Sequence, residues 1–301
     1  MLRKQDIHKE SLPDRLETAS RQDRAGIMFH RQANRTTWES AVRTLEVIYI
    51  STVKNLRSEH GSPIIGLLMT LITTLTLIAI FYFMFTLMGR DLTAKIRGDF
   101  VLFLMTGVFI FLTHNKAVGS VMGAEGPTSP MMLHEPVSTV TAIASSALAT
   151  LYNQVFVMIV LLFIYHAAVT PITIEQPVYA FGMLLLGWFT GIAIGILLYS
   201  LKPWAPRLVG IISTVYRRAN MIASGKMFVA NTLPASMVAV FDWNPLFHCI
   251  DQARGFTFLN YNPHNTSISY PLYLGLALVM LGLIFEYYTR RMASLHWAKG
   301  R

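Results

Sequence analysis

The sequence predicts an all-α integral membrane protein with six transmembrane helices, an N-terminal amphipathic interface helix and two short re-entrant-type helices before the last span. Only 14% of its 301 residues are charged, whereas 53% are hydrophobic. Soluble domains carry about 25% charged residues. Long uncharged runs separate the charges, so the formal net charge of +9 does not indicate a nucleic-acid partner. The composition therefore argues against a soluble enzyme and against a disordered protein.

Three uncharged runs predict spans directly: Pro63–Met88, Val137–Tyr165 and Val178–Leu201. As helices, even the shortest reaches roughly 36 Å, more than the hydrocarbon core of about 30 Å. Three further runs contain polar or charged residues and bring the total to six: Phe100–Met122, Pro206–Phe228 and Ser269–Thr289.

The basic residues predict the orientation of these spans. Most of the 25 Lys and Arg residues fall in the segment before Pro63 and in connections on the same side. Basic flanking segments stay in the cytoplasm, so we expect both termini there. The single cysteine, Cys249, excludes an internal disulfide framework.

The segments outside the spans divide into a tail, a helix and a second tail. Residues 1–36 are polar, and we expect a disordered cytoplasmic tail there. Residues 37–62 place apolar side chains at spacings of three and four, which predicts an amphipathic helix along the cytoplasmic membrane face. The alternative is a helix packed on a soluble partner. Residues 290–301 are expected to form a cytoplasmic C-terminal tail.

The connection between the second and third predicted spans carries an apolar segment framed by polar residues, Pro and Gly. Met131 and Met132 are its centre, and such a knob suggests a partner's groove. Equally, the knob could enter the lipid headgroup layer. The candidate coupling residues of this loop are Glu125, Gly126, Met131, Met132, His134 and Glu135.

The stretch after Lys226 predicts two short helices on the outer side. Ala235–Phe241 is the first. Asn244 is a good N-cap and Pro245 suits the first helical position of the second, which we expect to end near Arg254 at Gly255. Asp251 and Arg254 are spaced to pair. These helices lie flat on the surface or dip into the membrane, where a broken helix survives only against protein or a polar cavity.

Two further groups of residues stand out within the spans. Arg217 and Arg218, with Tyr216, are candidates for a translocation path, since an intramembrane arginine needs water, a partner or an anion. The alternative is that both arginines extend to the cytoplasmic interface. Gly187, Gly191 and Gly195 share one helix face and predict close helix packing, within one subunit or between two.

The sequence lacks a phosphate loop, a His-Glu-x-x-His helix and metal-ligand spacing among its nine histidines. We therefore predict no catalytic, cofactor-binding or metal site, and no enzyme activity on this chain.

The order of these parts resembles an ABC-2-type permease, and more closely the subfamily that exports capsular polysaccharide or O-antigen. The most specific match is Trp243-Asn244-Pro245-Leu246-Phe247-His248, with Asp251 and Arg254 following. The loop from Gly126 to Thr139 is similar to the family's ATPase-contacting loop. The resemblance covers about residues 40–294.

The resemblance implies a bacterial inner-membrane homodimer that moves a lipid-linked glycan, driven by a separate ATP-binding subunit. The implied partners also include membrane lipid and a periplasmic polysaccharide co-polymerase or export protein. In this picture Met131 and Met132 seat in an ATPase groove. The implied outer gate is formed by Phe228, Trp243, Asn244, Pro245, Asp251 and Arg254.

Other functions stay open on the sequence. They are an ABC-2 permease for a lipid, drug or teichoic-acid-type polymer, a glycan-modifying membrane enzyme using His114, and an ion-coupled carrier.

Overall fold

The computed structural model describes residues 37–58, 62–87, 98–124 and 138–299, and within these ranges it is helical without strands. The chain divides into two units after Glu46, and all candidate spans belong to the unit Val47–Arg301. Helix α2, Thr37–Ser58, agrees in position with the predicted amphipathic helix. Its apolar side chains Trp38, Leu45 and Tyr49 are exposed. Its place at a membrane interface stays a prediction.

Five helices in the described ranges are long and apolar enough to cross a membrane, which indicates a multi-pass membrane protein. They match five of the six predicted spans closely: α3 (Pro63–Leu87), α5 (Phe100–Met122), α7 (Thr139–Ala168), α8 (Pro177–Leu201) and α12 (Ser269–Lys299). The last helix continues well past Thr289, so most of the predicted C-terminal tail is helical.

Helix α9, Pro206–Ala223, occupies the position of the remaining predicted span but is not among the five. It contains three arginines, and it ends at Ala223 rather than at Phe228 as we predicted. The count of six spans therefore stays a prediction.

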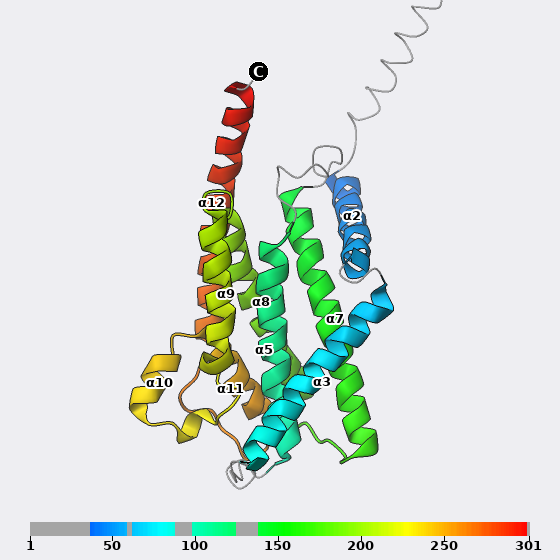
Figure 1. Ribbon diagram of the computed structural model, residues 1–301, viewed down its shortest axis with the longest axis vertical. Helices are drawn as coiled ribbons and strands as arrows, with labels where there is room; N and C mark the ends of the chain where they lie inside the picture. Colours follow the sequence, from blue (N-terminus) through cyan, green and yellow to red (C-terminus); the bar gives the residue numbers. More distant parts are fainter. Residues whose placement is uncertain (1–36, 59–61, 88–97, 125–137, 300–301) are drawn as a thin grey trace, which may run out of the picture. The chain divides into compact units, whose positions relative to one another are not determined.

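The relative direction of α8 and α12 indicates the direction in which α9 runs. A Cβ on Gly275 would meet the ring of Phe189, and the indole of Trp204 donates to the Thr289 hydroxyl at 2.8 Å. Because the contact of Gly275 precedes that of Thr289 along α12, as Phe189 precedes Trp204 along the chain, α8 and α12 run in parallel. The segment between them must return the chain, and α9 runs back along α8 in Figure 1.

Helix α5 is the centre of the bundle and packs against α3, α7, α8, α9 and α11. The Asp99 carboxylate caps its start by accepting from the Val101 and Leu102 N–H groups. Its middle is buried on all sides, including the side chains of Phe103, His114 and Val118. A helix apolar all round is expected at such a place.

The glycine stripe of α8 lies where this helix packs on α5. A Cβ would lie 2.8 Å from Ile110 at Gly187, 2.6 Å from the His114 carbonyl oxygen at Gly191, and 2.8 Å from Val121 at Gly195. The close approach is thus made within one chain, which answers the question the sequence left open.

Three short elements connect α9 to α12: the 3₁₀ turn Ala230–Thr232, α10 (Ala235–Phe241) and α11 (Pro245–Thr257). The predicted bounds of α10 are confirmed. Helix α11 packs against α8 and α5. Its end meets the start of α8, because the Gln176 N–H donates to the Phe256 carbonyl at 2.9 Å.

Candidate functional site

The candidate site begins where α9 breaks off. Gly225 has a φ of +75°, in the left-handed region that favours glycine. A Cβ at this position would lie 2.6 Å from a ring carbon of Phe247, so no larger residue fits without displacing α11. The last carbonyls of any α-helix lack intrahelical donors. Here the chain turns away among packed helices, so other donors must reach those carbonyls.

Arg254 of α11 supplies donors to the broken segment. Its side chain is 1% exposed. Its guanidinium donates to the carbonyl oxygens of Gly225 at 2.9 Å, Phe228 at 2.8 Å and Lys226 at 2.7 Å. The guanidinium carbon also lies 3.7 Å from the centre of the Phe103 ring on α5. One planar cation thereby fixes three carbonyls of a four-residue irregular stretch against the central helix.

Lys226 holds the other side of the break. Its ammonium donates to the Met221 carbonyl of α9 at 2.5 Å and lies 3.7 Å from the centre of the Phe111 ring. The Phe81 ring of α3 is 5.4 Å away. The carbonyl and the ring faces both attract the positive charge of the ammonium. The two cations therefore tie α9, α11, α3 and α5 to one junction, which we call the cation junction (Lys226 and Arg254).

Asp251 does not pair with Arg254, and the pairing that we predicted is wrong. No ion pair between them is found in the part of the chain that the structure describes. The Asp251 carboxylate instead accepts from the Tyr261 phenol and from the Thr266 hydroxyl at 2.8 Å. Asp251 thus anchors the segment after α11, whereas the Arg254 guanidinium binds backbone carbonyls.

Asn244 caps α11 as the sequence predicted. Its side-chain oxygen accepts from the Leu246 N–H at 3.0 Å, and Pro245 holds the first helical position. Its amide also donates to the Asn220 side chain at 2.9 Å and to the Ala223 carbonyl at 3.0 Å. Asn244 therefore links the start of α11 to the end of α9, in addition to its local role.

The end of α11 differs from our prediction. The helix continues through Gly255 to Thr257, with Phe258 extended after it. A Cβ on Gly255 would lie 2.6 Å from Pro263. Gly255 therefore allows close packing of the following loop and does not terminate the helix.

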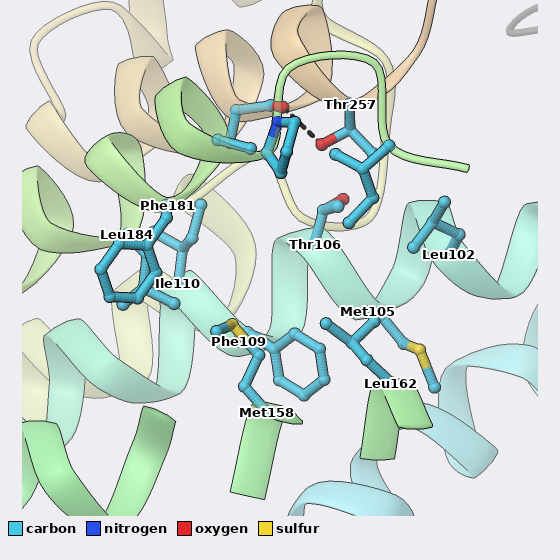
Figure 2. Close-up of a pocket in the computed structure, with 14 residues that line it drawn as sticks. Leu102, Met105, Thr106, Phe109, Ile110, Met158, Leu162, Phe181, Leu184 and Thr257 are labelled. Carbon is cyan, nitrogen blue, oxygen red and sulfur yellow. Dashed lines mark hydrogen bonds between the residues drawn. The ribbon is translucent and has the colours of Figure 1, made fainter. Parts of the chain in front are cut away.

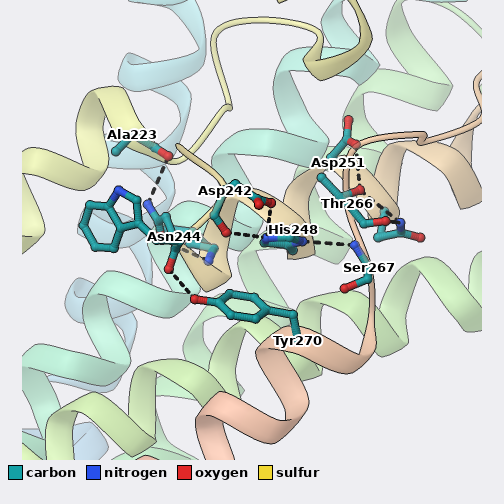
Figure 3. Close-up of polar contacts among 11 residues, drawn as sticks. Ala223, Asp242, Asn244, His248, Asp251, Thr266, Ser267 and Tyr270 are labelled. Atoms are coloured by element: carbon teal, nitrogen blue, oxygen red, sulfur yellow. Dashed lines mark hydrogen bonds and ion pairs between the residues drawn. The ribbon is translucent and has the colours of Figure 1, made fainter. Parts of the chain in front are cut away.

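Figure 3 shows how the two short helices are joined to α12. The His248 Nε2 atom lies 2.7 Å from the Asp242 carbonyl oxygen and 3.2 Å from its carboxylate. The Ser267 N–H donates to His248 Nδ1 at 3.0 Å, which places the His248 proton on Nε2. The Tyr270 hydroxyl of α12 donates to the Trp243 carbonyl at 2.7 Å.

The aromatic residues of the predicted outer gate take two different positions. The Phe228 ring centre lies 5.2 Å from that of Phe241 and 6.4 Å from that of Phe247. The Trp243 side chain, by contrast, is 60% exposed. Phe228 is therefore part of the packing between α10 and α11, whereas Trp243 presents its indole outward.

The predicted path residues are divided between two faces of α9. The Tyr216 hydroxyl lies 2.8 Å from Nε2 of the buried His114. A Cβ on Gly119 would lie 3.0 Å from a guanidinium nitrogen of Arg217, so this side chain lies along α5. Its Nε is buried with no hydrogen-bond partner, and Arg218 is exposed. Both arginines line a hollow of about 430 Å³, together with Thr214 and Met221.

The candidate coupling residues between 125 and 135 lie outside the described residues, as does the predicted tail 1–36. Within the described ranges, no group of three His, Cys, Asp or Glu side chains is placed to hold a metal ion.

Sequence reasoning missed the role of Lys226, which we had taken only as an interruption of a span. The signal was present: a lysine directly after a glycine, at the end of a long apolar stretch, with Phe81 and Phe111 in other runs. Only the tertiary contacts show which rings and which carbonyl surround it.

Comparison with known proteins adds no assignment, since neither protein-family models nor curated proteins match this chain.

Proposed function

We propose that this chain is the membrane subunit of an ABC-type exporter for a polysaccharide, acting as a homodimer with a separate ATP-binding subunit. The observation that carries the proposal is the junction between α9 and α11: a helix that breaks off among packed helices and continues as a buried short helix before the last span. This arrangement agrees with the outer helices that the ABC-2 resemblance implies.

In this proposal α9 crosses the membrane as the sixth span, and α11 lies at membrane depth on the outer side. Irregular backbone at that depth is tolerated only when protein or a polar cavity satisfies it. The cation junction of Lys226 and Arg254 fulfils this condition by donating to carbonyls of Met221, Gly225 and Phe228. The outer gate would therefore be a rigid insert rather than a flexible loop.

The path itself would run along the open face of α9. Arg218 is exposed, and neither arginine of the pair has an ion-pair partner among the described residues. An anionic group passing this face would be attracted by both guanidinium groups. The proposal thus favours a glycan with carboxylate or phosphate groups, released on the side of α10 and α11.

The chain would act as a conduit and not as an enzyme. His114, the histidine that a membrane enzyme would need, contacts the Gly187 carbonyl, Thr190 and Tyr216. No carboxylate is among these partners, so a positioned acid–base pair is not assembled around it. This favours a role of His114 in holding α5, α8 and α9 together.

The proposal is tested by isolating the chain from its native membranes under mild conditions. We expect an ATP-binding subunit to co-purify in equal amount and the complex to hydrolyse ATP. The double variant Met131→Asp, Met132→Asp should lose that subunit while α3 to α12 stay folded. Retention of the subunit by this variant would contradict the docking role of the loop, and isolation of the wild-type chain without any ATPase would contradict the proposal itself.

A further inference from the structure

An apolar pocket that is partly open to the outside lies among α5, α7, α8 and α11. Its volume is about 260 Å³. Figure 2 shows Met158 and Leu162 of α7 on one side and Thr257 of α11 on the opposite side. Helices α7 and α8 each pack along α5 but make few contacts with one another. The pocket lies in the space between them.

The lining disfavours water as the occupant. Among the described residues that line the pocket, Thr106 and Thr257 carry the hydroxyl groups. Both donate to carbonyls of their own helices, Thr106 to Phe103 at 2.8 Å and Thr257 to Ala253 at 2.7 Å. A buried water needs two to four polar partners. The remaining described lining consists of aliphatic, aromatic and methionine side chains, which favours a hydrocarbon over water in this pocket.

The surroundings identify the source of that hydrocarbon. The cavity is bounded by three of the five candidate spans. Phe181 in its wall is 39% exposed, so the cavity reaches the outside of the helix bundle. On neighbouring turns of α7, Ile159 and Phe163 are exposed, as side chains that face lipid are. The medium that reaches this opening is the acyl region of the bilayer.

The volume limits the length of chain that fits. A dry cavity of about 150 Å³ takes up benzene, so 260 Å³ holds about ten carbon atoms by proportion. This corresponds to the distal part of one fatty acyl chain. We propose that the cavity binds the end of one acyl chain of a membrane phospholipid, wedged between α7 and α8 against α11.

This lipid would be a structural component beside α11. Ala253 and Thr257 in the pocket wall belong to α11, the first directly before Arg254 and the second about one turn after it. The acyl chain therefore supports the same helix that the cation junction holds from the other side. The inference depends only on a membrane location, and it stands whether or not the chain is an exporter.

The test uses the full chain in nanodiscs of phosphatidylethanolamine and phosphatidylglycerol. The probe is a phosphatidylcholine with a photoreactive diazirine near the end of one acyl chain, and labelled residues are mapped by mass spectrometry. We expect labelling concentrated on Met105, Met158 and Leu162, well above that on the lipid-facing Ile159. Equal labelling of the pocket and of Ile159 would overturn the proposal.

Two variants fill the cavity from opposite sides: Ala180→Phe on α8 and Leu162→Trp on α7. Each should remove most of the labelling of Met105, and either one suffices if the other fails to fold. The matched control is Gly182→Phe on the same helix as Ala180, since a Cβ there meets nothing within 4 Å. It should label as the wild type does. Unchanged labelling of Met105 in a folded, cavity-filled variant would contradict the assignment.

A competition experiment distinguishes the acyl chain from other occupants. Excess unlabelled phospholipid should reduce labelling of the pocket in proportion to its amount. Displacement by a polyprenyl phosphate but not by phospholipid would assign the cavity to a different lipid and overturn the proposal. If the pocket is protected from labelling in dimers but not in monomers, a second copy of the chain covers it. That result would also overturn the proposal.

Discussion

The most informative perturbation is the removal of the Arg254 charge. Arg254→Met keeps a long unbranched side chain but deletes all donors to the carbonyls of Gly225, Lys226 and Phe228. Each buried carbonyl left without a donor costs about 1–3 kcal/mol. Because the variant also avoids the desolvation of a buried charge, we take the low end, which gives a loss of about 3 kcal/mol for three carbonyls.

This loss should be local to the junction. At about 1.4 kcal/mol per tenfold change, 3 kcal/mol corresponds to roughly 100-fold less protection of backbone amides against hydrogen exchange. We expect it in residues 224–258, measured by mass spectrometry on the full chain in nanodiscs, while α7 keeps its protection. Arg254→Lys should recover part of the effect, since an ammonium replaces only some of the donors.

Arg207→Met is the matched control, because Arg207 is an exposed arginine on α9. It should leave the protection of residues 224–258 unchanged. Wild-type protection of this segment in Arg254→Met would refute the view that the guanidinium holds the broken backbone.

Four further predictions follow from other contacts. Asn244→Ala removes the cap and two donated hydrogen bonds, which lowers the local stability by about 2 kcal/mol. Backbone amides at the start of α11 should then be about 30-fold less protected against hydrogen exchange. Unchanged exchange there would reject the link to α9. Gly191→Leu should abolish the monodisperse peak in fluorescence-detected size-exclusion chromatography, because its Cβ would lie 2.6 Å from the His114 carbonyl oxygen. The control Gly182→Leu should keep that peak, since a Cβ there meets nothing within 4 Å. Equal profiles of the two variants would argue against tight packing of α8 on α5. Lys226→Met should lower the melting temperature, because it removes the donor to the Met221 carbonyl and the cation over the Phe111 ring; a melting temperature equal to that of the wild type would show that the ammonium does not hold the junction. In a Cys249→Ala background, Pro203→Cys and Asn260→Cys should be labelled from opposite sides of the membrane, and labelling from one side only would show that α9 does not cross.

The spans were predictable because hydrophobic periodicity and length suffice for a membrane helix. Pro63, Phe100 and Pro177 begin helices within a residue of the positions that charge and proline placement indicate. The cap at Asn244 was also predictable, because the Asn-Pro pair specifies its own local geometry.

The cation junction was not predictable, because its partners are carbonyls and ring faces far apart in the sequence. Helical spacing made Asp251 the obvious partner of Arg254, yet Tyr261 and Thr266 take that carboxylate. Likewise Gly255 suggested a helix end, and only the position of Pro263 shows that it serves packing. Local rules predict caps and spans, whereas tertiary contacts decide which polar groups meet.

We propose that this chain is a passive conduit that a separate ATPase drives. The decisive experiment reconstitutes the chain in proteoliposomes, alone and as the complex isolated with its ATP-binding subunit, and measures movement of an acidic lipid-linked glycan. We expect ATP-dependent movement by the complex, a strong reduction in Arg217→Glu, and none with the chain alone. Transport by the chain alone, driven by an ion gradient, would contradict it.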